Sequence, residues 1–464
     1  MAGDGWTTKR LGEVANINPD SIERDWPHPH ISYIDISSVG VGKIEVAPRK
    51  MKISDAPGRA KRIVRKGDTV LSTVRPNRRS MFFASEPSED WIVSTGFAVL
   101  RPIMNLVEPR FLYACVFNQT FTEYLISREE GAAYPAVSPE DIANAEIPYP
   151  PLKEQRAIAC ILGTLDDKIE LNRRMNKTLE EMAQAIFKSW FVDFDPVRAK
   201  AAVRREHPHW SNEQVSRTAC PNLKPEIAAL FPDSFEDSEL GMIPKGWKIR
   251  PIGEVVQVLG GGTPSTKEPA FWEGGIHPFC TPKDMASLTD PILLQTERHL
   301  TDEGLDKVSS GQLPLGTIML SSRAPIGYLA VAETPVSVNQ GIIAMVCDGE
   351  LPNLYVMHWA KANMDRILAN ANGSTFMEIS KRNFRPINTV VPLSQILQRF
   401  MLMVEPMHRR VVSSLRQIEI LAALRDTLLP KLISGKLRLP AALLERVSET
   451  KLKPAEHFLK ESEP

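Results

Sequence analysis

The residues of this 464-residue chain that are able to carry catalysis do not stand at the spacings that catalysis requires. Ser434-Gly435-Lys436-Leu437 lacks the upstream glycine of a phosphate loop, and leucine stands where Ser or Thr would bind magnesium. The Pro-Asp pairs at 19–20 and 232–233 have no Glu-x-Lys nearby to complete a nuclease cluster, and the sequence lacks the Asn/Asp-Pro-Pro-aromatic tetrad of amino-methyltransferases. We therefore expect no catalytic site in this chain.

Metal ligands are equally sparse. The closest histidines form two His-Pro-His triplets, at 28–30 and 207–209, and the five cysteines stand apart at 115, 160, 220, 280 and 347. Such spacing fits neither a zinc site nor a disulfide framework. Apolar runs stay well short of the roughly 18 residues that cross a bilayer, and residues 1–10 show no apolar leader. We expect a cytoplasmic protein that binds no metal or cofactor itself.

Two loops, at 72–79 and 321–328, carry side chains suited to reading the edges of DNA bases. Their sequences are Ser-Thr-Val-Arg-Pro-Asn-Arg-Arg and Ser-Ser-Arg-Ala-Pro-Ile-Gly-Tyr. Arginine matches O6 and N7 of guanine, and Asn or Gln matches N6 and N7 of adenine. A structural role is the alternative for each candidate. The candidate DNA-contacting residues are Arg75, Asn77, Arg78, Arg79, Lys61, Arg62, Arg323, Tyr328, Asn339, Gln340 and Lys283.

A basic segment at 48–79 supports contact with phosphate. It holds eleven Lys or Arg against two acidic residues, although the whole chain has a net charge of zero. A solvated basic loop is the alternative. The run Gly260-Gly261-Gly262-Thr263 could also cradle a phosphate with its backbone N–H groups, but no helical pattern follows it, which favours a tight turn.

The elements that position these loops are duplicated. Trp6 recurs as Trp247, Gly131 as Gly373, and Pro151-Leu152 as Pro392-Leu393, at an offset of about 242 residues. Solenoid repeats run only about 20–50 residues. The offset therefore predicts a tandem duplication of a whole domain plus a helix, with two similar sites related by a pseudo-twofold axis.

Each half ends in a long helical pattern of about 40 residues, or roughly 60 Å, with apolar residues at heptad spacing. Such a seam predicts that the two helices pair, while packing of each helix on its own domain is the alternative. Pro406 either marks a late first turn or kinks the second helix. The predicted seam comprises Leu162, Leu165, Ile169, Asn172, Asn176, Leu179, Ile186 and Trp190 in the first helix, and Val404, Met407, Val411, Ile418, Leu421, Leu428 and Leu432 in the second.

The fold class that follows is α/β, with two similar mixed α/β domains joined by two long, paired, coiled-coil-like helices. Proline and glycine punctuation supports short strands in each domain. The predicted boundaries are a first domain at 1–150, a first helix at 151–192, a crossing linker at 193–241, a second domain at 242–391, a second helix at 392–434 and a tail at 435–464.

Over nearly its whole length the chain resembles the specificity subunit of type I restriction–modification enzymes. In the second half, Pro392-Leu393-Ser394-Gln395 departs from the usual Pro-Leu-x-Glu-Gln. The resemblance rests on Gly5-Trp6 with Leu11-Gly12-Glu13, Ile243-Pro244-Lys245-Gly246-Trp247, Pro151-Leu152-Lys153-Glu154-Gln155-Arg156, Phe187-Lys188-Ser189-Trp190-Phe191 running to Val197, and Leu230-Phe231-Pro232-Asp233.

The resemblance implies two target-recognition domains, each reading one half of a bipartite, asymmetric DNA target. The two long, coiled-coil-like helices would pair antiparallel and set the unread spacer. Two methylation subunits would dock on them, with restriction subunits bound through those. S-adenosylmethionine, ATP and magnesium would belong to those partners. Two other classes are open: a DNA methyltransferase with its own recognition domains, opposed by the missing cofactor motif, and a helical scaffold without DNA affinity, opposed by the basic segment.

Overall fold

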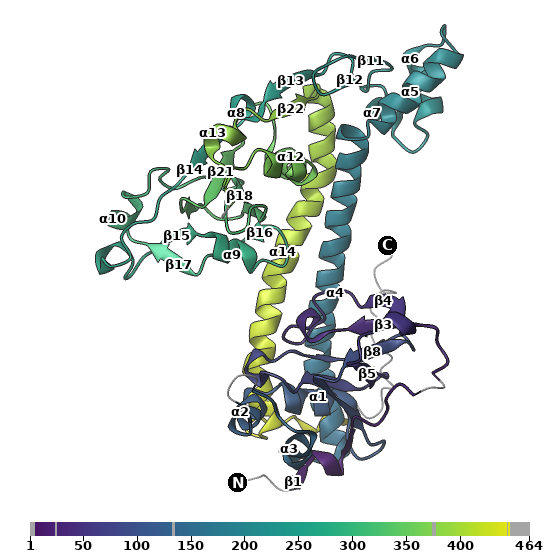
Figure 1. Cartoon of the computed structure of the whole chain (residues 1–464), viewed down its shortest axis with the longest axis vertical. Helices are drawn as coiled ribbons and strands as arrows, with labels where there is room; N and C mark the ends of the chain where they lie inside the picture. Colours follow the sequence, from purple (N-terminus) through teal and green to yellow (C-terminus); the bar gives the residue numbers. More distant parts are fainter. Residues whose placement is uncertain (1–4, 24–25, 132–134, 374–376, 443, 446–464) are drawn as a thin grey trace. The chain divides into compact units, whose positions relative to one another are not determined.

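The computed structural model describes residues 5–23, 26–131, 135–373, 377–442 and 444–445 (Figure 1). The chain forms two compact units, each taken by itself below. Unit 1 comprises residues 1–171 and 417–464, and unit 2 comprises residues 172–416. Both unit boundaries fall inside long helices, so each unit holds one α/β domain together with a segment of each helix.

The domain of unit 1 contains two four-stranded sheets. One has the order β2-β9-β6-β7 and is antiparallel, and the other has the order β4-β3-β8-β5, with β3 and β8 parallel. Helices line the core with side chains such as Phe111 and Leu112. The elements are β1 (Thr7–Arg10), β2 (Ala15–Ile17), β3 (His30–Ile34), β4 (Arg49–Lys52), β5 (Ala60–Ile63), β6 (Thr69–Ser72), β7 (Met81–Phe83), β8 (Trp91–Ser94), β9 (Phe97–Pro102), α1 (Pro109–Phe117), α2 (Gln119–Ser127), α3 (Pro139–Asn144) and β10 (Glu146–Tyr149).

The domain of unit 2 contains a five-stranded sheet, β14-β21-β18-β19-β16, and a three-stranded sheet, β17-β15-β20. Its central strands are continuous apolar runs, because both of their faces are covered. The elements are β13 (Lys248–Pro251), α8 (Ile252–Val255), β14 (Gln257–Gly260), β15 (His277–Cys280), α9 (Pro282–Ala286), β16 (Ile292–Leu293), β17 (Arg298–Leu300), α10 (Asp302–Leu305), β18 (Ile318–Ser321), β19 (Leu329–Ala332), β20 (Ser337–Val338), β21 (Ile342–Val346), α11 (Asn353–Ala362), α12 (Met364–Ala369), α13 (Lys381–Phe384) and β22 (Asn388–Val391).

The duplication appears in the hydrogen bonds of both domains. The Thr73 amide donates to the Gly96 carbonyl at 2.9 Å, and the Ser322 amide donates to the Gly341 carbonyl at 2.8 Å. The parallel pair β3–β8 recurs as β15–β20. A serine N-cap starts α3 and another starts α13, through Ser138 and Ser380. The predicted duplicated α/β fold is confirmed.

Two helices of 40 residues each, α4 (Leu152–Phe191) and α14 (Ser394–Ile433), run through both units. In unit 1, Asp166 of α4 accepts from Arg425 Nη1 of α14 at 2.9 Å. In unit 2, Phe187 of α4 lies 6.0 Å from Phe400 of α14 between ring centroids. Higher numbers in α4 therefore meet lower numbers in α14, which confirms the antiparallel helices.

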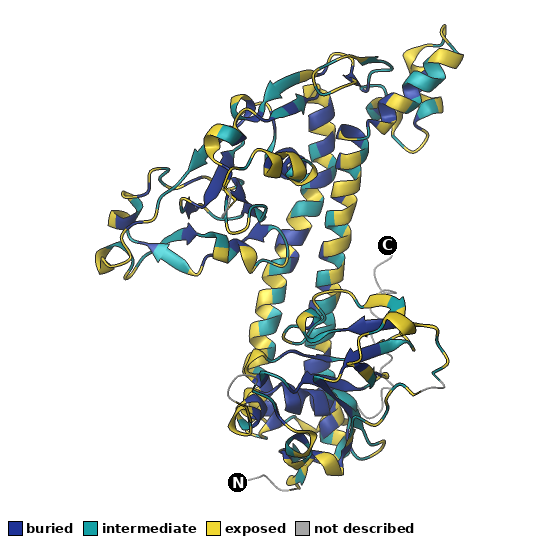
Figure 2. Ribbon diagram, in the orientation of Figure 1, coloured by how far each residue is buried: buried dark blue, intermediate teal, exposed yellow. Residues whose placement is uncertain are grey.

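The predicted seam residues are all buried or half-buried, and they alternate with exposed residues along each helix (Figure 2). Pro406 is not in a first turn, because α14 begins twelve positions earlier, at Ser394. Without an N–H, Pro406 leaves the carbonyl of Leu402 without its intrahelical donor. Both side chains are exposed, so water is able to reach this part of the helix.

Each helix ends in the core of the domain that it does not follow. The end of α4 packs its Phe191 ring 5.0 Å from Tyr355 and 6.0 Å from Trp247, in the second domain. The end of α14 places Leu432 and Ile433 in the first domain's core. Packing of each helix on its own domain alone, the alternative considered above, is therefore wrong.

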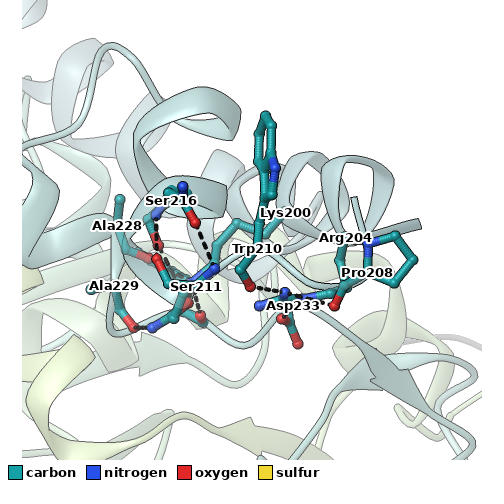
Figure 3. A network of polar contacts seen from close by, with 12 residues as sticks. Lys200, Arg204, Pro208, Trp210, Ser211, Ser216, Ala228, Ala229 and Asp233 are labelled. Atoms are coloured by element: carbon teal, nitrogen blue, oxygen red, sulfur yellow. Dashed lines mark hydrogen bonds and ion pairs between the residues drawn. The ribbon is translucent and has the colours of Figure 1, made fainter. Parts of the chain in front are cut away.

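The segment predicted as a crossing linker, 193–241, is folded. It contains the helices α5 (Asp195–Glu206), α6 (Asn212–Ala219) and α7 (Pro225–Ala228), and the short strand β11 (Phe235–Glu236), which pairs with β12 (Ile243–Pro244). Lys200 is fully buried among them. Its ammonium donates to Asn212 Oδ1 at 2.8 Å, to the Ala228 carbonyl at 3.1 Å and to the Phe231 carbonyl at 2.6 Å (Figure 3). Burial lowers the pKa of Lys200, and these acceptors compensate the desolvated charge. A charge- and proline-rich composition alone did not indicate this internal support.

Within the described residues, no helix combines the length and apolarity that a membrane crossing requires.

Asn176 is a polar residue buried in the seam between the two long helices. It is fully buried, and neither its Oδ1 nor its Nδ2 has a hydrogen-bond partner in the described part of the chain. An unsatisfied buried polar group costs about 1–3 kcal/mol. We expect Asn176→Leu to raise the melting temperature of the protein, measured by calorimetry. The exposed neighbour Thr178→Leu is the control and should leave it unchanged. A lower melting temperature for Asn176→Leu would show that this amide supports the helix pair.

Candidate nucleic-acid interface

In each domain the predicted reading loops gather at one end of a sheet. β9 is antiparallel to both β2 and β6, so the start of β9 lies beside the ends of β2 and β6. In the second domain, the start of β21 lies beside the ends of β14 and β18 for the same reason (Figure 1). We call these regions the loop ends of the two domains. Loops 73–80 and 95–96 meet at the first, and loops 261–265, 322–328 and 339–341 meet at the second.

The loop after β6 has a fixed shape. Its short 3-10 turn, Pro76–Arg78, is flanked by Arg75 and Arg79, which have left-handed φ angles of 49° and 53°. Residues other than glycine adopt this region rarely, and such conformations are found at functional sites. The Arg75 amide also donates to the Pro135 carbonyl at 2.9 Å. Asn77 and Arg78 are exposed at the tip of the turn, so they are the predicted residues of this loop best placed to meet a ligand.

Arg79 occupies a different position. Its guanidinium donates to the Phe117 carbonyl at the end of α1 and lies 4.9 Å from the centre of the Phe117 ring. Its Nε is buried and has no hydrogen-bond partner among the described residues. Because these contacts hold the loop against α1, we revise the prediction for Arg79 from DNA contact to support of the loop.

The basic segment does not form one patch. β4 and β5 are opposite edges of their sheet, so Arg49 and Lys50 are separated from Lys61 by two strands. Lys61 is exposed, whereas Arg62 is half-buried, with Nη1 lacking a partner among the described residues. Burial lowers the pKa of Arg62. An Arg buried in this way is poorly placed for a phosphate, so the prediction of DNA contact is kept for Lys61 and not for Arg62.

Acidic neighbours neutralise part of the segment. Arg59 pairs with Asp35 at 2.5 Å, and Arg65 pairs with Asp20 at 3.0 Å. A hydrogen bond from Arg101 is the main cause that lowers the pKa of Asp20. The positive charge available to a ligand is therefore smaller than the sequence count suggests.

The second loop end brings together three of the predicted residues. Arg323 Nη1 lies 3.9 Å from Glu378 Oε2. Asn339 Oδ1 accepts from the Gly341 amide at 2.9 Å, so this side chain shapes its own turn. Gln340 is exposed, and its Oε1 accepts from the Thr263 hydroxyl at 2.7 Å.

Tyr328 and Lys283 are less well suited to reading bases. The Tyr328 side chain is half-buried against the core cluster that contains Met319, so it belongs mainly to the fold. Lys283 is exposed, but its ammonium pairs with Glu297 at 2.7 Å. A phosphate at Lys283 would have to compete with that carboxylate.

Thr263 and Lys381 were missed as members of this site. The available signal was the glycine run at 260–262, which the sequence favoured as a tight turn. A Cβ at Gly261 would lie 1.6 Å from the Val338 carbonyl oxygen, so the loop rests directly on β20. A Cβ at Gly260 would lie 2.8 Å from Lys381 Nζ. These two positions require glycine because neighbouring atoms approach the backbone closely there, and not only because the chain turns.

Neither loop end has the composition of a metal centre. Among the described residues, no group of three or more His, Cys, Asp or Glu side chains is arranged to hold a metal ion. His207 of one His-Pro-His triplet stacks on Trp210, with ring centroids 3.7 Å apart. The arrangement at both loop ends is one of hydrogen-bond donors, acceptors and cations, which suits recognition.

Comparison with known proteins identifies similar chains. The family model described as the type I restriction modification DNA specificity domain matches residues 3–181 and 244–402. The HindI specificity subunit of Haemophilus influenzae is 27% identical, with 93% of this chain and 99% of that protein covered. The MjaIX specificity subunit of Methanocaldococcus jannaschii is 25% identical, with 93% and 94% covered. The solved S subunit from M. genitalium shares the fold, with a TM-score of 0.53 at 14% identity and 94% and 97% coverage.

Arg78 and Arg79 form a matched pair for a test. Arg79→Ala removes a charged hydrogen bond, a contact that contributes about 1.5–3 kcal/mol, so we expect a lower melting temperature. Arg78→Ala should leave the melting temperature unchanged. If Arg78 meets a phosphate, its loss should weaken DNA binding about uniformly across sequences and reduce the salt slope by about one. Titrations with the assembled complex at several salt concentrations measure this. If Arg79→Ala has the melting temperature of the wild type and changes only DNA binding, the assignment of Arg79 to support of the loop is wrong.

Proposed function

This chain belongs to the type I restriction–modification DNA specificity family, and we propose that its two domains each read one half of a bipartite DNA target. Its role is that of a DNA sequence-specificity subunit. The methyltransferase and scaffold alternatives are not favoured, since the relatives that match 93% of the chain are themselves named specificity subunits.

One observation carries the bipartite proposal: the same loops gather at the same end of the duplicated sheets, but with different side chains. The first loop end presents Asn77 and Arg78, and the second presents Arg323 and Gln340. Two similar sheets that present different side chains at their loop ends fit a target whose two halves differ in sequence. Each reader carries the donors or acceptors that base edges in the major groove can match.

We further propose that the long helices set the length of the unread spacer. A continuous helix of 40 residues spans roughly 60 Å, which corresponds to about 18 base pairs at 3.4 Å each. A helix resists compression and bending more than a loop of equal length does. The spacer would then follow from the number of helical turns between the two domains.

The catalytic steps are assigned to partners in this proposal. Two methylation subunits would dock on the helices, and restriction subunits would bind through them, with S-adenosylmethionine, ATP and magnesium held by those subunits. Exposed apolar side chains support a docking role for the helices: in unit 1, Leu171 of α4 is 57% exposed, and Ile420 and Leu424 of α14 are 68% and 45% exposed. The dispersed thiols fit the cytoplasm as the place where the complex works.

Exchange of the first domain tests bipartite reading. Residues 1–150 would be replaced by the corresponding domain of a family member with a different target, and methylated adenines would be mapped across a genome. We expect one half of the target to change and the other half to stay, because each loop end is built within its own unit. A change in both halves would contradict modular reading. Exchange of residues 242–391 is the reciprocal control.

A paired insertion tests the spacer. Seven residues added to α4 between Asn172 and Asn176, and seven added to α14 between Ser414 and Ile418, keep both seams in phase and add roughly 10 Å. We expect a spacer about three base pairs longer, with both half-sites unchanged. Insertions of two residues rotate the seam by about 200° and should prevent assembly. An active heptad variant with the original spacer would show that the helices do not set it.

A further inference from the structure

We propose that Gln340, held by Thr263, is a base-reading residue of the second domain and selects adenine at one position of its half-site. This inference rests on the proposed function and adds a specificity-determining residue to it. The pair is Thr263 Oγ1 donating to Gln340 Oε1 at 2.7 Å. It joins the loop after β14 to the turn between β20 and β21 at the second loop end.

The two neighbouring amides at this turn have different tasks. Asn339 is half-buried and uses its Oδ1 to accept from the Gly341 amide two residues on, which closes the turn. Gln340 is exposed, and within the described part of the chain its side chain bonds only to Thr263, which is also exposed. Of the two amides, Gln340 is therefore the one that a ligand is able to reach.

The position of Thr263 is fixed by its preceding loop. Gly261 lies so close to β20 that a Cβ there would be 1.6 Å from the Val338 carbonyl oxygen, a distance that no side chain permits. The Pro264 ring that follows Thr263 is buried. Thr263 is thereby anchored on both sides, and its hydroxyl holds the Gln340 amide in place before DNA arrives. Such preorganisation reduces the side-chain entropy lost on binding.

Two cations stand beside the amide pair. A Cβ at Gly341, next to Gln340, would lie 3.4 Å from Arg323 Nε. A Cβ at Gly260, which is three residues before Thr263, would lie 2.8 Å from Lys381 Nζ. Cations at the border of a reading site meet the phosphates that flank the base, and they fix the register of the protein on DNA. The cluster thus combines one oriented amide with two cations, of which Arg323 also lies 3.9 Å from Glu378.

The hydrogen-bonding capacity of the held amide matches adenine. The Thr263 hydroxyl occupies one lone pair of Gln340 Oε1, which leaves the second lone pair and both Nε2 hydrogens. Adenine presents an N6 donor and an N7 acceptor in the major groove, which a glutamine amide satisfies together. In the first domain the equivalent residue before Gly96 is Thr95, which has no amide, so this turn offers the contact in the second domain and not in the first.

The test maps methylated adenines produced by the specificity subunit assembled with its methylation subunits. Loss of a bidentate contact lowers discrimination by roughly 5- to 150-fold at the contacted position. Gln340→Ala should therefore relax one position of one half-site and leave the other half-site unchanged. Thr263→Val should relax the same position by a smaller factor. Gln340→Glu should move the preference at that position toward cytosine, whose N4 group donates to a carboxylate.

Gln257→Ala is the matched control, since Gln257 is exposed at the start of β14, at the opposite end of that strand from the second loop end; its target should equal that of the wild type. Melting temperatures of all variants check that the domain is folded. The inference is overturned if folded Gln340→Ala keeps the wild-type preference at every position, or if it weakens methylation equally at all sequences. Those results leave bipartite reading by the wild type intact. Failure of the proposed function itself would appear in the wild type, as a target without two separated halves.

Discussion

The structure depends on the reciprocal docking of the two long helices. α4 leaves the first domain and ends with Phe191 against Trp247 and Tyr355 of the second, while α14 leaves the second domain and ends with Ile433 in the core of the first. Aromatic side chains of this size bury 150–250 Å² each and dominate core energetics. Neither domain therefore has a complete core without the helix that arrives from the other half of the chain. Antiparallel pairing and the two compact units follow from this exchange.

The duplicated halves have diverged at the supports of this core as well as at the loops. Trp6 Nε1 donates to Glu154 Oε2 at 2.9 Å, and Arg438 of the C-terminal segment donates to the same carboxylate at 3.0 Å. In the second half, Gln395 stands in the place of Glu154 and is exposed. Trp247 Nε1 is buried with no partner in the described part of the chain. A buried donor without a partner costs about 1–3 kcal/mol. The Trp247 indole therefore contributes to the second half through packing in the core and not through a hydrogen bond.

The two loop ends offer different chemistry for the proposed recognition of DNA. The first loop end offers Arg78 and Asn77 on a strained turn, with further cations on both edges of the neighbouring sheet. The second offers an oriented amide beside Arg323 and Lys381. Phosphate contacts supply affinity and register, whereas base contacts supply sequence. In the proposed function one fold accommodates two unequal half-sites, because the loops differ between the domains while the strands that carry them are buried.

The sequence alone determined the duplication, the α/β class, the two paired helices and the family. Each of these follows from residue spacing or from a short motif along the chain: an offset of about 242 residues, apolar residues at heptad spacing, and stretches such as Gly246-Trp247. The tertiary structure alone decided how individual polar residues are used. Arg79 meets Phe117, Lys200 meets Phe231, and Thr263 meets Gln340 across separations of 38, 31 and 77 residues. Side-chain periodicity reports which face of an element is buried, but it carries no information about which distant group a buried or exposed polar atom will meet.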